Sequence, residues 1–320
     1  MNLVKLKPKS SLHLGIKEGK TEGTETIIHS DTLFSAFCHS YLLLYGEEKL
    51  KNLLDRFVKD SPPFLISSSF PFWDNEFYFP IPKNQIPKEK ELKKIQFVVK
   101  ENFEKLLQGE KLNQEMGAIP VLNREETKTP WKVQNVPHVS LSRFSNQPGE
   151  GFFHSGEVWF NKEAGLFFLV SFVDKDFEKE FKATINLLAD EGIGGDRSSG
   201  KGLFEIPVFG ETEIKFPKEA NGFLTLSLYF PQKGEVSNLS KGFYELIERK
   251  GYIFSPSCQS LRRKSVRMFA EGSLFPKDKI KGELVDVTPE LSEKIGLLHK
   301  VYRYGLPFPI PCRLEIKDEN

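Results

Sequence analysis

The sequence has little cysteine and almost no excess charge. Its three cysteines, Cys38, Cys258 and Cys312, are odd in number, and no CxxC pair or Cys/His cluster has the spacing of a zinc site. We therefore expect no disulfide framework, no bound metal and no cofactor. The 45 basic and 44 acidic side chains leave a net charge of +1. Any affinity for nucleic acid must therefore come from local clusters of charge.

Long apolar runs are absent as well. No stretch of the 320 residues approaches the length of a membrane span. The first residues alternate apolar and basic side chains from Leu3 to Lys7, which is typical of a strand and unlike a signal peptide. We therefore expect a cytoplasmic protein with no membrane contact. The content of 39% hydrophobic and 28% charged residues is typical of a globular chain with one large or two medium domains.

What the sequence does have is a glycine-rich segment at residues 192–202, which we call the glycine loop. An amphipathic helix is expected before it, over 177–188, and a strand after it, over 203–209. Glycine and serine amides can form a concave anion site, and Arg197 and Lys201 could add charge for phosphate. The residues expected to hold an RNA backbone are Gly194, Gly195, Asp196, Arg197, Ser198, Ser199, Gly200 and Lys201.

Two other interpretations of the glycine loop stay open. Gly195 to Lys201 fits the spacing of a phosphate-binding P-loop, but Gly202 stands where that motif needs Ser or Thr for magnesium. A P-loop also runs from strand to helix, whereas here a helix precedes the loop. The second alternative is a turn with a structural role only. A cradle for a polynucleotide backbone fits best.

Three further segments could contact a ligand. A helix is expected from His29, with Ser30 as its N-cap and Asp31 in its first turn. His29 or Ser30 could instead contact a ligand there. Residues 135–143 alternate after Pro137 and end in Arg143, as in an extended hairpin arm against RNA or an edge strand. The third segment is the basic cluster Arg262, Arg263 and Lys264, with aromatic residues nearby, which favours an RNA path or a solvated face.

The order of elements predicts an α+β fold of two ferredoxin-like (RRM-like) domains. Residues 1–210 read β-α-β-β-α-β, with a long irregular insert at about 81–150. Residues 222–320 form the second domain, with a strand at 223–230 and a helix at 242–250. The tail at 299–308 is expected to pack on the first domain. Exposed aromatic residues in 70–79 and 302–308 are candidates for subunit contacts.

Four islands together resemble one family. They are His29–Ala36, Glu191–Gly202, Phe269–Ser273 and Tyr302–Gly305, and they are similar to the fourth Csm subunit of type III-A CRISPR–Cas effector complexes. The glycine loop alone marks the wider RAMP superfamily. The resemblance implies a non-catalytic RNA-binding subunit of an antiviral ribonucleoprotein, which holds the 5′ handle of the crRNA. It also implies two protein partners, the large palm-domain subunit and the third Csm backbone subunit.

The resemblance also implies roles for particular residues. The glycine loop would hold the handle backbone, His29 and Ser30 would lie beside it, and Val136 to Arg143 would form a thumb-like arm. The alternative function is a RAMP-type endoribonuclease that processes precursor crRNA. Such cleavage needs a general base, usually His, close to a 2′-hydroxyl. None of the six histidines pairs with a second His or Tyr in an evident acid–base motif.

Overall fold

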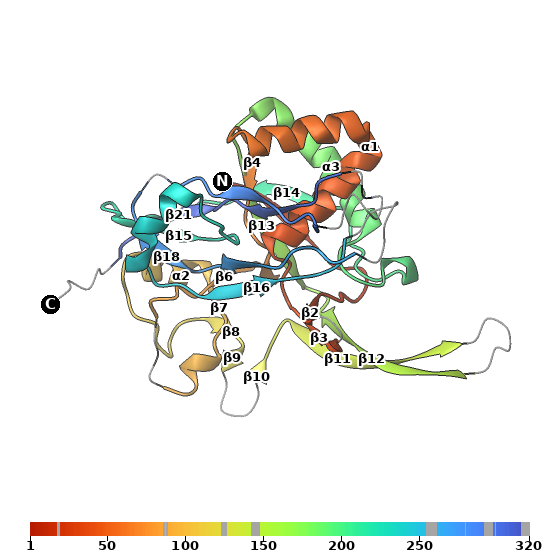
Figure 1. The fold of residues 1–320 in the computed structure, drawn as a ribbon. Coiled ribbons are helices and arrows are strands. Elements are labelled where there is room, and N and C mark those ends of the chain that lie inside the picture. Colours follow the sequence, from red (N-terminus) through yellow and green to blue (C-terminus); the bar gives the residue numbers. More distant parts are fainter. Residues whose placement is uncertain are drawn as a thin grey trace.

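A computed structural model describes residues 1–17, 20–85, 87, 89–122, 127–141, 148–253, 261–278, 280–290, 297 and 299–314. The fold is mixed α/β with many strands and few helices, as the sequence predicts (Figure 1). No helix in these residues is long and apolar enough to cross a membrane.

The core of the molecule is one antiparallel sheet of eight strands. Seven of them follow the order β14-β1-β13-β5-β6-β7-β8, and β4 also pairs with β13. Their bounds are β1 Asn2–Leu6, β4 Phe64–Ile66, β5 Phe70–Trp73, β6 Glu76–Pro80, β7 Phe97–Val99, β8 Ala118–Ile119, β13 Ala164–Phe172 and β14 Val208–Glu211. Seven consecutive residues of β13, Ala164–Val170, are buried, so this strand has the core on both faces.

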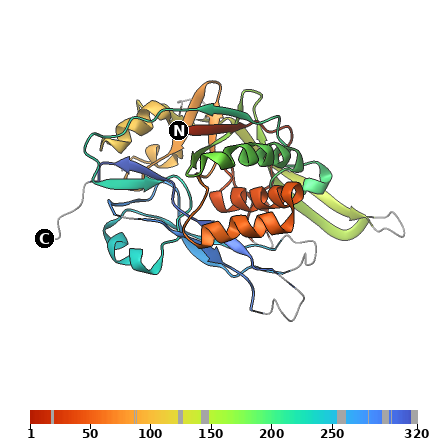
Figure 2. The same cartoon turned by 90° about the horizontal axis from the view of Figure 1, so that it is seen from above.

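Two helices, α1 (Ser30–Val58) and α3 (Glu178–Glu191), lie side by side on one face of the sheet (Figures 1 and 2). Phe37 of α1 and Phe181 of α3 stack with ring centroids 5.2 Å apart. Gly46 interrupts α1 at φ +82°. The helix resumes and continues to Val58. The apolar spacing expected over 177–188 is confirmed, because Phe181, Ile185 and Leu188 are buried.

The insert is less irregular than predicted. It carries the 3₁₀ turn η1 (Leu92–Lys94), helix α2 (Lys100–Leu107) and several short strands, of which β9 (Val121–Leu122) pairs with β10 (Thr127–Lys128). Strands of two or three residues are too short to show a hydrophobic period, which is why the sequence gives no sign of them. Strand β6 lies within the segment 70–79 where exposed aromatic residues are expected, but most of these aromatic residues are not on the surface. Phe70, Phe72, Tyr78 and Phe79 are buried and are not surface contacts, whereas Trp73 and Phe77 are half-buried, so the expected subunit contact stays a prediction for these two.

The end of the insert is a long two-stranded hairpin, which we call the arm. It consists of β11 (Trp131–Leu141) and β12 (Pro148–Phe160) and extends away from the body (Figures 1 and 2). The extended hairpin predicted around 135–143 is thus present. A smaller hairpin, β2 (Gly15–Lys17) and β3 (Lys20–Thr24), packs on its base. Gly156 of β12 is required there, because a Cβ would lie 2.2 Å from the carbonyl oxygen of Glu22.

The second half consists of short antiparallel strands. They are β15 (Gly222–Thr225) with β18 (Leu274–Pro276) and β21 (Pro309–Cys312), β16 (Leu246–Arg249) with β17 (Val266–Phe269), and β19 (Glu283–Asp286) with β20 (Tyr302–Gly305). The helix predicted over 242–250 is wrong, because Leu246–Arg249 is strand β16. Residues after Glu191 form no α-helix in the described part, only the 3₁₀ segments η3 (Arg197–Ser199) and η4 (Lys233–Lys241).

The two halves share one hydrophobic core. Tyr304 of β20 packs against Phe34 of α1, with ring centroids 5.0 Å apart, and its hydroxyl accepts a hydrogen bond from Ile66 N–H (3.1 Å). The prediction that residues 299–308 pack on the first domain is therefore confirmed. Phe308 and Tyr304 are buried by this packing, so neither is an exposed aromatic for a partner.

Candidate nucleic-acid interface

The glycine loop begins where α3 ends. Gly192 closes the helix at φ +78°, and Ile193 is buried beneath the loop. Gly202, at φ +75°, ends the loop next to its first residues, and its carbonyl accepts a hydrogen bond from Ile193 N–H (3.0 Å). A Cβ on Gly202 would lie 2.1 Å from the Ile193 carbonyl oxygen, so only glycine closes the loop here.

A strap of residues 8–13 holds the glycine loop in position. Gly202 N–H donates to Ser11 O (2.8 Å), and Gly195 N–H donates to His13 O (2.9 Å). On the other side of the strap, Leu12 exchanges two backbone hydrogen bonds with Val158 of the arm (3.0 and 2.8 Å). The structure therefore brings the glycine loop and the base of the arm together, although they are distant in sequence.

Lys201 links the same two elements by charge. Its ammonium lies 2.7 Å from Glu157 Oε1 of β12 and 3.1 Å from Asp196 Oδ2, and its side chain is only 13% exposed. Burial alone would raise the pKa of Glu157, but Lys201 and Ser11 outweigh it and lower that pKa. Glu157 and Asp196 likewise raise the pKa of Lys201 against its burial. The predicted phosphate-binding cation is thus already paired within the protein.

The outer part of the glycine loop is a short turn that faces solvent. Gly195, Asp196, Ser198, Ser199 and Gly200 are exposed, and Arg197 is half-buried. Ser199 and Gly200 amides close the 3₁₀ turn η3, whereas the amides of Asp196 and Ser198 donate to no acceptor in the described residues. A Cβ on Gly200 would meet nothing within 4 Å. Exposed amides beside open space are the arrangement expected for contact with an anionic backbone.

The arm presents apolar and aromatic side chains on both faces. Phe152 is 64% exposed and Phe153 44%, and the Phe153 ring stacks on His138 with centroids 5.2 Å apart. Val133 and Trp159 at its base are also about half exposed (51% and 45%). Arg143, the predicted RNA contact of the arm, lies outside the described residues.

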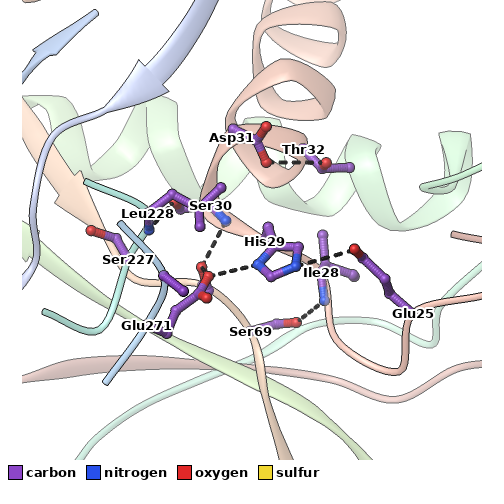
Figure 3. A network of polar contacts seen from close by, with 12 residues as sticks. Glu25, Ile28, His29, Ser30, Asp31, Thr32, Ser69, Ser227, Leu228 and Glu271 are labelled. Carbon is purple, nitrogen blue, oxygen red and sulfur yellow. Dashed lines mark hydrogen bonds and ion pairs between the residues drawn. The ribbon is translucent and has the colours of Figure 1, made fainter. Parts of the chain in front are cut away.

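His29 and Ser30 lie in a different environment from the glycine loop. They belong to a buried polar cluster between α1 and the second half, which we call the joint (Figure 3). Ser30 is the first residue of α1 and does not cap it. Its hydroxyl instead accepts from Leu228 N–H (3.0 Å). The capping role expected for Ser30 is therefore wrong by one position, since the N-cap residue is His29.

Both ring nitrogens of His29 face carboxylates. Nδ1 lies 2.7 Å from Glu271 Oε1, and Nε2 lies 3.2 Å from Glu25 Oε2 (Figure 3). Burial alone would lower the pKa of His29, but Glu271 and Glu25 raise it to about 10. His29 is therefore a charged structural residue near neutral pH. The same Glu271 oxygen also accepts from the Ser68 hydroxyl.

Asp31 binds two arginines from the second half. Arg249 of β16 donates to both carboxylate oxygens (3.1 and 3.0 Å), and Arg303 of β20 donates to Oδ2. Burial would raise the pKa of Asp31, but the two guanidiniums hold it well below its usual range. Three of the four islands that carry the family resemblance thus meet at the joint: His29–Ala36, Phe269–Ser273 and Tyr302–Gly305.

The joint forms part of the wall of a large cleft, with a volume of about 1340 Å³. Glu25, His29, Arg249 and Glu271 line one part, and residues of the insert, of the central sheet and of strand β16 line the rest. Lys83 and Glu245 form an ion pair (2.5 Å) between the insert and the second half. No group of three or more His, Cys, Asp or Glu side chains in the described residues could hold a metal.

The sequence did not point to the serines that complete the joint. Ser67, Ser68 and Ser69 are fully buried. Ser68 Oγ accepts from Ser30 N–H (2.8 Å), and Ser69 Oγ accepts from Ile28 N–H (2.6 Å). A run of three serines is typical of a surface loop, and no local pattern shows that two distant backbone segments need these acceptors.

The fold and these two polar sites define a mixed α/β protein with a glycine-rich turn beside a long arm. Residues 218–312 match the family described as the CRISPR Csm4 C-terminal domain. The chain is also 28% identical to the "CRISPR system Cms protein Csm4" of Methanocaldococcus jannaschii, over 97% of each chain. It is 28% identical to the protein of the same name from Thermococcus onnurineus, over 90% of this chain and 92% of that one.

Solved structures show the same fold. The Csm4 chain in a crystal structure of a Csm3-Csm4 subcomplex from the type III-A CRISPR-Cas interference complex superposes with a TM-score of 0.67, at 23% identity over 98% of this chain and 100% of that one. The match to a crystal structure of a Csm1-Csm4 cassette in complex with pppApA has a TM-score of 0.64, at 23% identity over 98% of both chains. Taken together, the sequence matches show that this chain is similar to Csm4 proteins along nearly its whole length, and that residues 218–312 resemble the Csm4 C-terminal domain.

Proposed function

We propose that this chain is a non-catalytic scaffold subunit that holds the 5′ handle of a crRNA and joins a large subunit to a backbone subunit. The observation that carries the proposal is the glycine loop, an exposed turn fixed against the base of a long arm, in which the amides of Asp196 and Ser198 have no acceptor among the described residues. The similar Csm4 chains crystallised with Csm1 and with Csm3 support the choice of partners. The order β14-β1-β13-β4 supports a ferredoxin-like first domain, with the second half as its divergent counterpart.

The scaffold role is favoured over RNA cleavage by the state of His29. A general base must be able to accept a proton near neutral pH. His29 holds its proton between two carboxylates, with a pKa of about 10, and is nearly buried. We therefore expect no cleavage of repeat RNA that depends on His29.

Binding of repeat-derived RNA as a function of salt tests the proposal. Each phosphate contact with a single strand contributes about 0.7 to the slope of log affinity against log salt. Arg197→Ala should weaken binding and lower the slope by about this amount. Lys51→Ala, which removes an exposed charge from α1, serves as the control and should change neither. If the RNA is cut, or if binding does not depend on salt, the proposal is wrong.

A further inference from the structure

The three cations of the basic cluster Arg262, Arg263 and Lys264 differ in their surroundings. Lys264 is exposed and lies 3.7 Å from Glu290. Arg262 lies over the Tyr252 ring, 5.5 Å from its centroid. Arg263 is half-buried and uses only Nε, which donates to the Tyr252 carbonyl (3.0 Å). Its two Nη groups have no acceptor, and no carboxylate pairs with it in the described residues.

Arg263 lies next to the joint through a shared backbone segment. Arg303, which binds Asp31, also donates from Nη2 to Lys250 O (2.9 Å). The Nε of Arg263 donates to the carbonyl of Tyr252, two residues after Lys250. The backbone N–H of Arg263 donates to Gly251 O (2.9 Å). The three guanidiniums of Arg249, Arg263 and Arg303 therefore belong to one cluster.

This cluster has more positive than negative charge. Its carboxylates are Glu25, Asp31 and Glu271, and its cations are His29, Arg249, Arg263 and Arg303. Within the described residues, every cation of this cluster except Arg263 contacts a carboxylate. Burial, and then the like charges of Arg303 and Arg249, lower the pKa of Arg263 to about 10, so it stays charged near neutral pH. Arg303 Nε is also buried with no acceptor in the described residues.

We propose that Arg263, supported by Arg303, binds a phosphate group, and that the source of this phosphate is an RNA backbone. A guanidinium with both Nη groups available can bind two phosphate oxygens in its plane. The Tyr252 ring, 49% exposed and covered on one side by Arg262, offers a surface on which a neighbouring base can stack. This inference rests on the proposed function only in that its ligand is RNA.

The test uses the full chain and repeat-derived RNA, titrated at several salt concentrations. Arg263→Gln should weaken binding several-fold and lower the salt slope by about 0.7, the contribution of one phosphate. The control Lys51→Gln, which removes an exposed charge from α1, should leave the slope unchanged. Tyr252→Ala should weaken binding without changing the slope, because it removes stacking and no charge. An Arg263→Gln variant that binds RNA with wild-type affinity and slope would overturn the inference.

A second measurement separates this site from the proposed function. Inorganic phosphate, added at constant ionic strength, should raise the melting temperature of the wild type and leave that of Arg263→Gln unchanged. Without phosphate, Arg263→Gln should melt no earlier than the wild type, because it removes an uncompensated charge. If phosphate stabilises the wild type but the RNA slope is the same in both proteins, the site takes free phosphate and the RNA assignment is wrong. If Arg197→Ala weakens RNA binding and Arg263→Gln does not, the proposed function stands and this site fails.

Discussion

At the scale of single residues, His29 makes folding depend on pH. Folding raises the pKa of His29 from 6.5 to about 10. The folded protein therefore holds this proton more tightly than the unfolded chain does, and the resulting stabilisation is full below pH 6.5. It is lost as the pH rises through about 10. His29→Gln should lower the unfolding free energy by about 3–5 kcal/mol, because it leaves the buried Glu271 carboxylate without its charged partner.

Chemical denaturation at about pH 6 and about pH 9 measures this effect. The difference in unfolding free energy between wild type and His29→Gln should be larger at the lower pH. His299→Gln, an exposed position, is the control and should differ little from wild type at either pH. A difference that grows as the pH rises would mean that His29 is neutral in the folded state.

Lys201 gives a second residue-scale prediction. The sequence favours it as a phosphate ligand, but the structure pairs it with Glu157 and Asp196. Lys201→Ala leaves the buried Glu157 carboxylate without its main donor, which should cost about 1–3 kcal/mol of unfolding free energy. Lys182→Ala, which breaks an exposed helix pair with Glu178, should cost less than about 0.5 kcal/mol. Thermal melting of both variants gives the comparison, and equal losses would contradict the anchoring role.

At the scale of elements, two glycines of the same loop should respond differently to alanine. Gly200 and Gly202 both have positive φ (+84° and +75°), so each substitution carries a backbone cost of roughly 1–2 kcal/mol. Only Gly202 also lacks space for a Cβ. Gly202→Ala should therefore displace the loop and reduce RNA affinity strongly, whereas Gly200→Ala should retain most of it. Binding measurements on the two variants decide, and equal affinities would show that loop closure does not matter.

The elements also show what the sequence could predict. Strand β1, helix α3 and the glycine loop have strong local sequence patterns, and the sequence predicts all three. The arm was found by alternation after Pro137, but its length was not, because its exposed faces lack a regular apolar period. Part of the predicted helix at 242–250 is strand β16 instead. In the strand, Leu246 pairs with Phe269 of β17, and Arg249 donates a hydrogen bond to Asp31. Such long-range pairing overrides local propensity.

At the scale of the whole molecule, the joint makes the two halves one cooperative unit. In the described part of the second half, about half of the buried apolar residues belong to the main core, whereas Phe223, Tyr229, Leu239 and Phe275 form a separate buried cluster. The three tryptophans, Trp73, Trp131 and Trp159, all lie in the first half. Asp31→Asn should therefore lower the unfolding midpoint by the same amount whether unfolding is followed by tryptophan fluorescence or by far-UV circular dichroism. Two separate transitions would show that the halves unfold independently.

The joint also shows why the site was only partly predictable. His29 and Ser30 stand out in the sequence as possible ligand contacts, because polar residues at a helix start often bind anions. Only the fold shows that these two residues form hydrogen bonds with residues far along the chain. Leu228, 198 positions away, donates to Ser30, and Glu271, 242 positions away, bonds to His29. RNA contact by His29 and Ser30 stays a prediction. The exposed turn of the glycine loop is the stronger candidate.

The most direct test is a density map of this chain bound to a guide RNA and its neighbouring subunits. We expect phosphates of the handle within hydrogen-bond distance of the amides of Asp196 and Ser198, with the arm beside the same strand. A map in which residues 195–200 face bulk solvent, while another subunit holds the RNA end, would contradict the account.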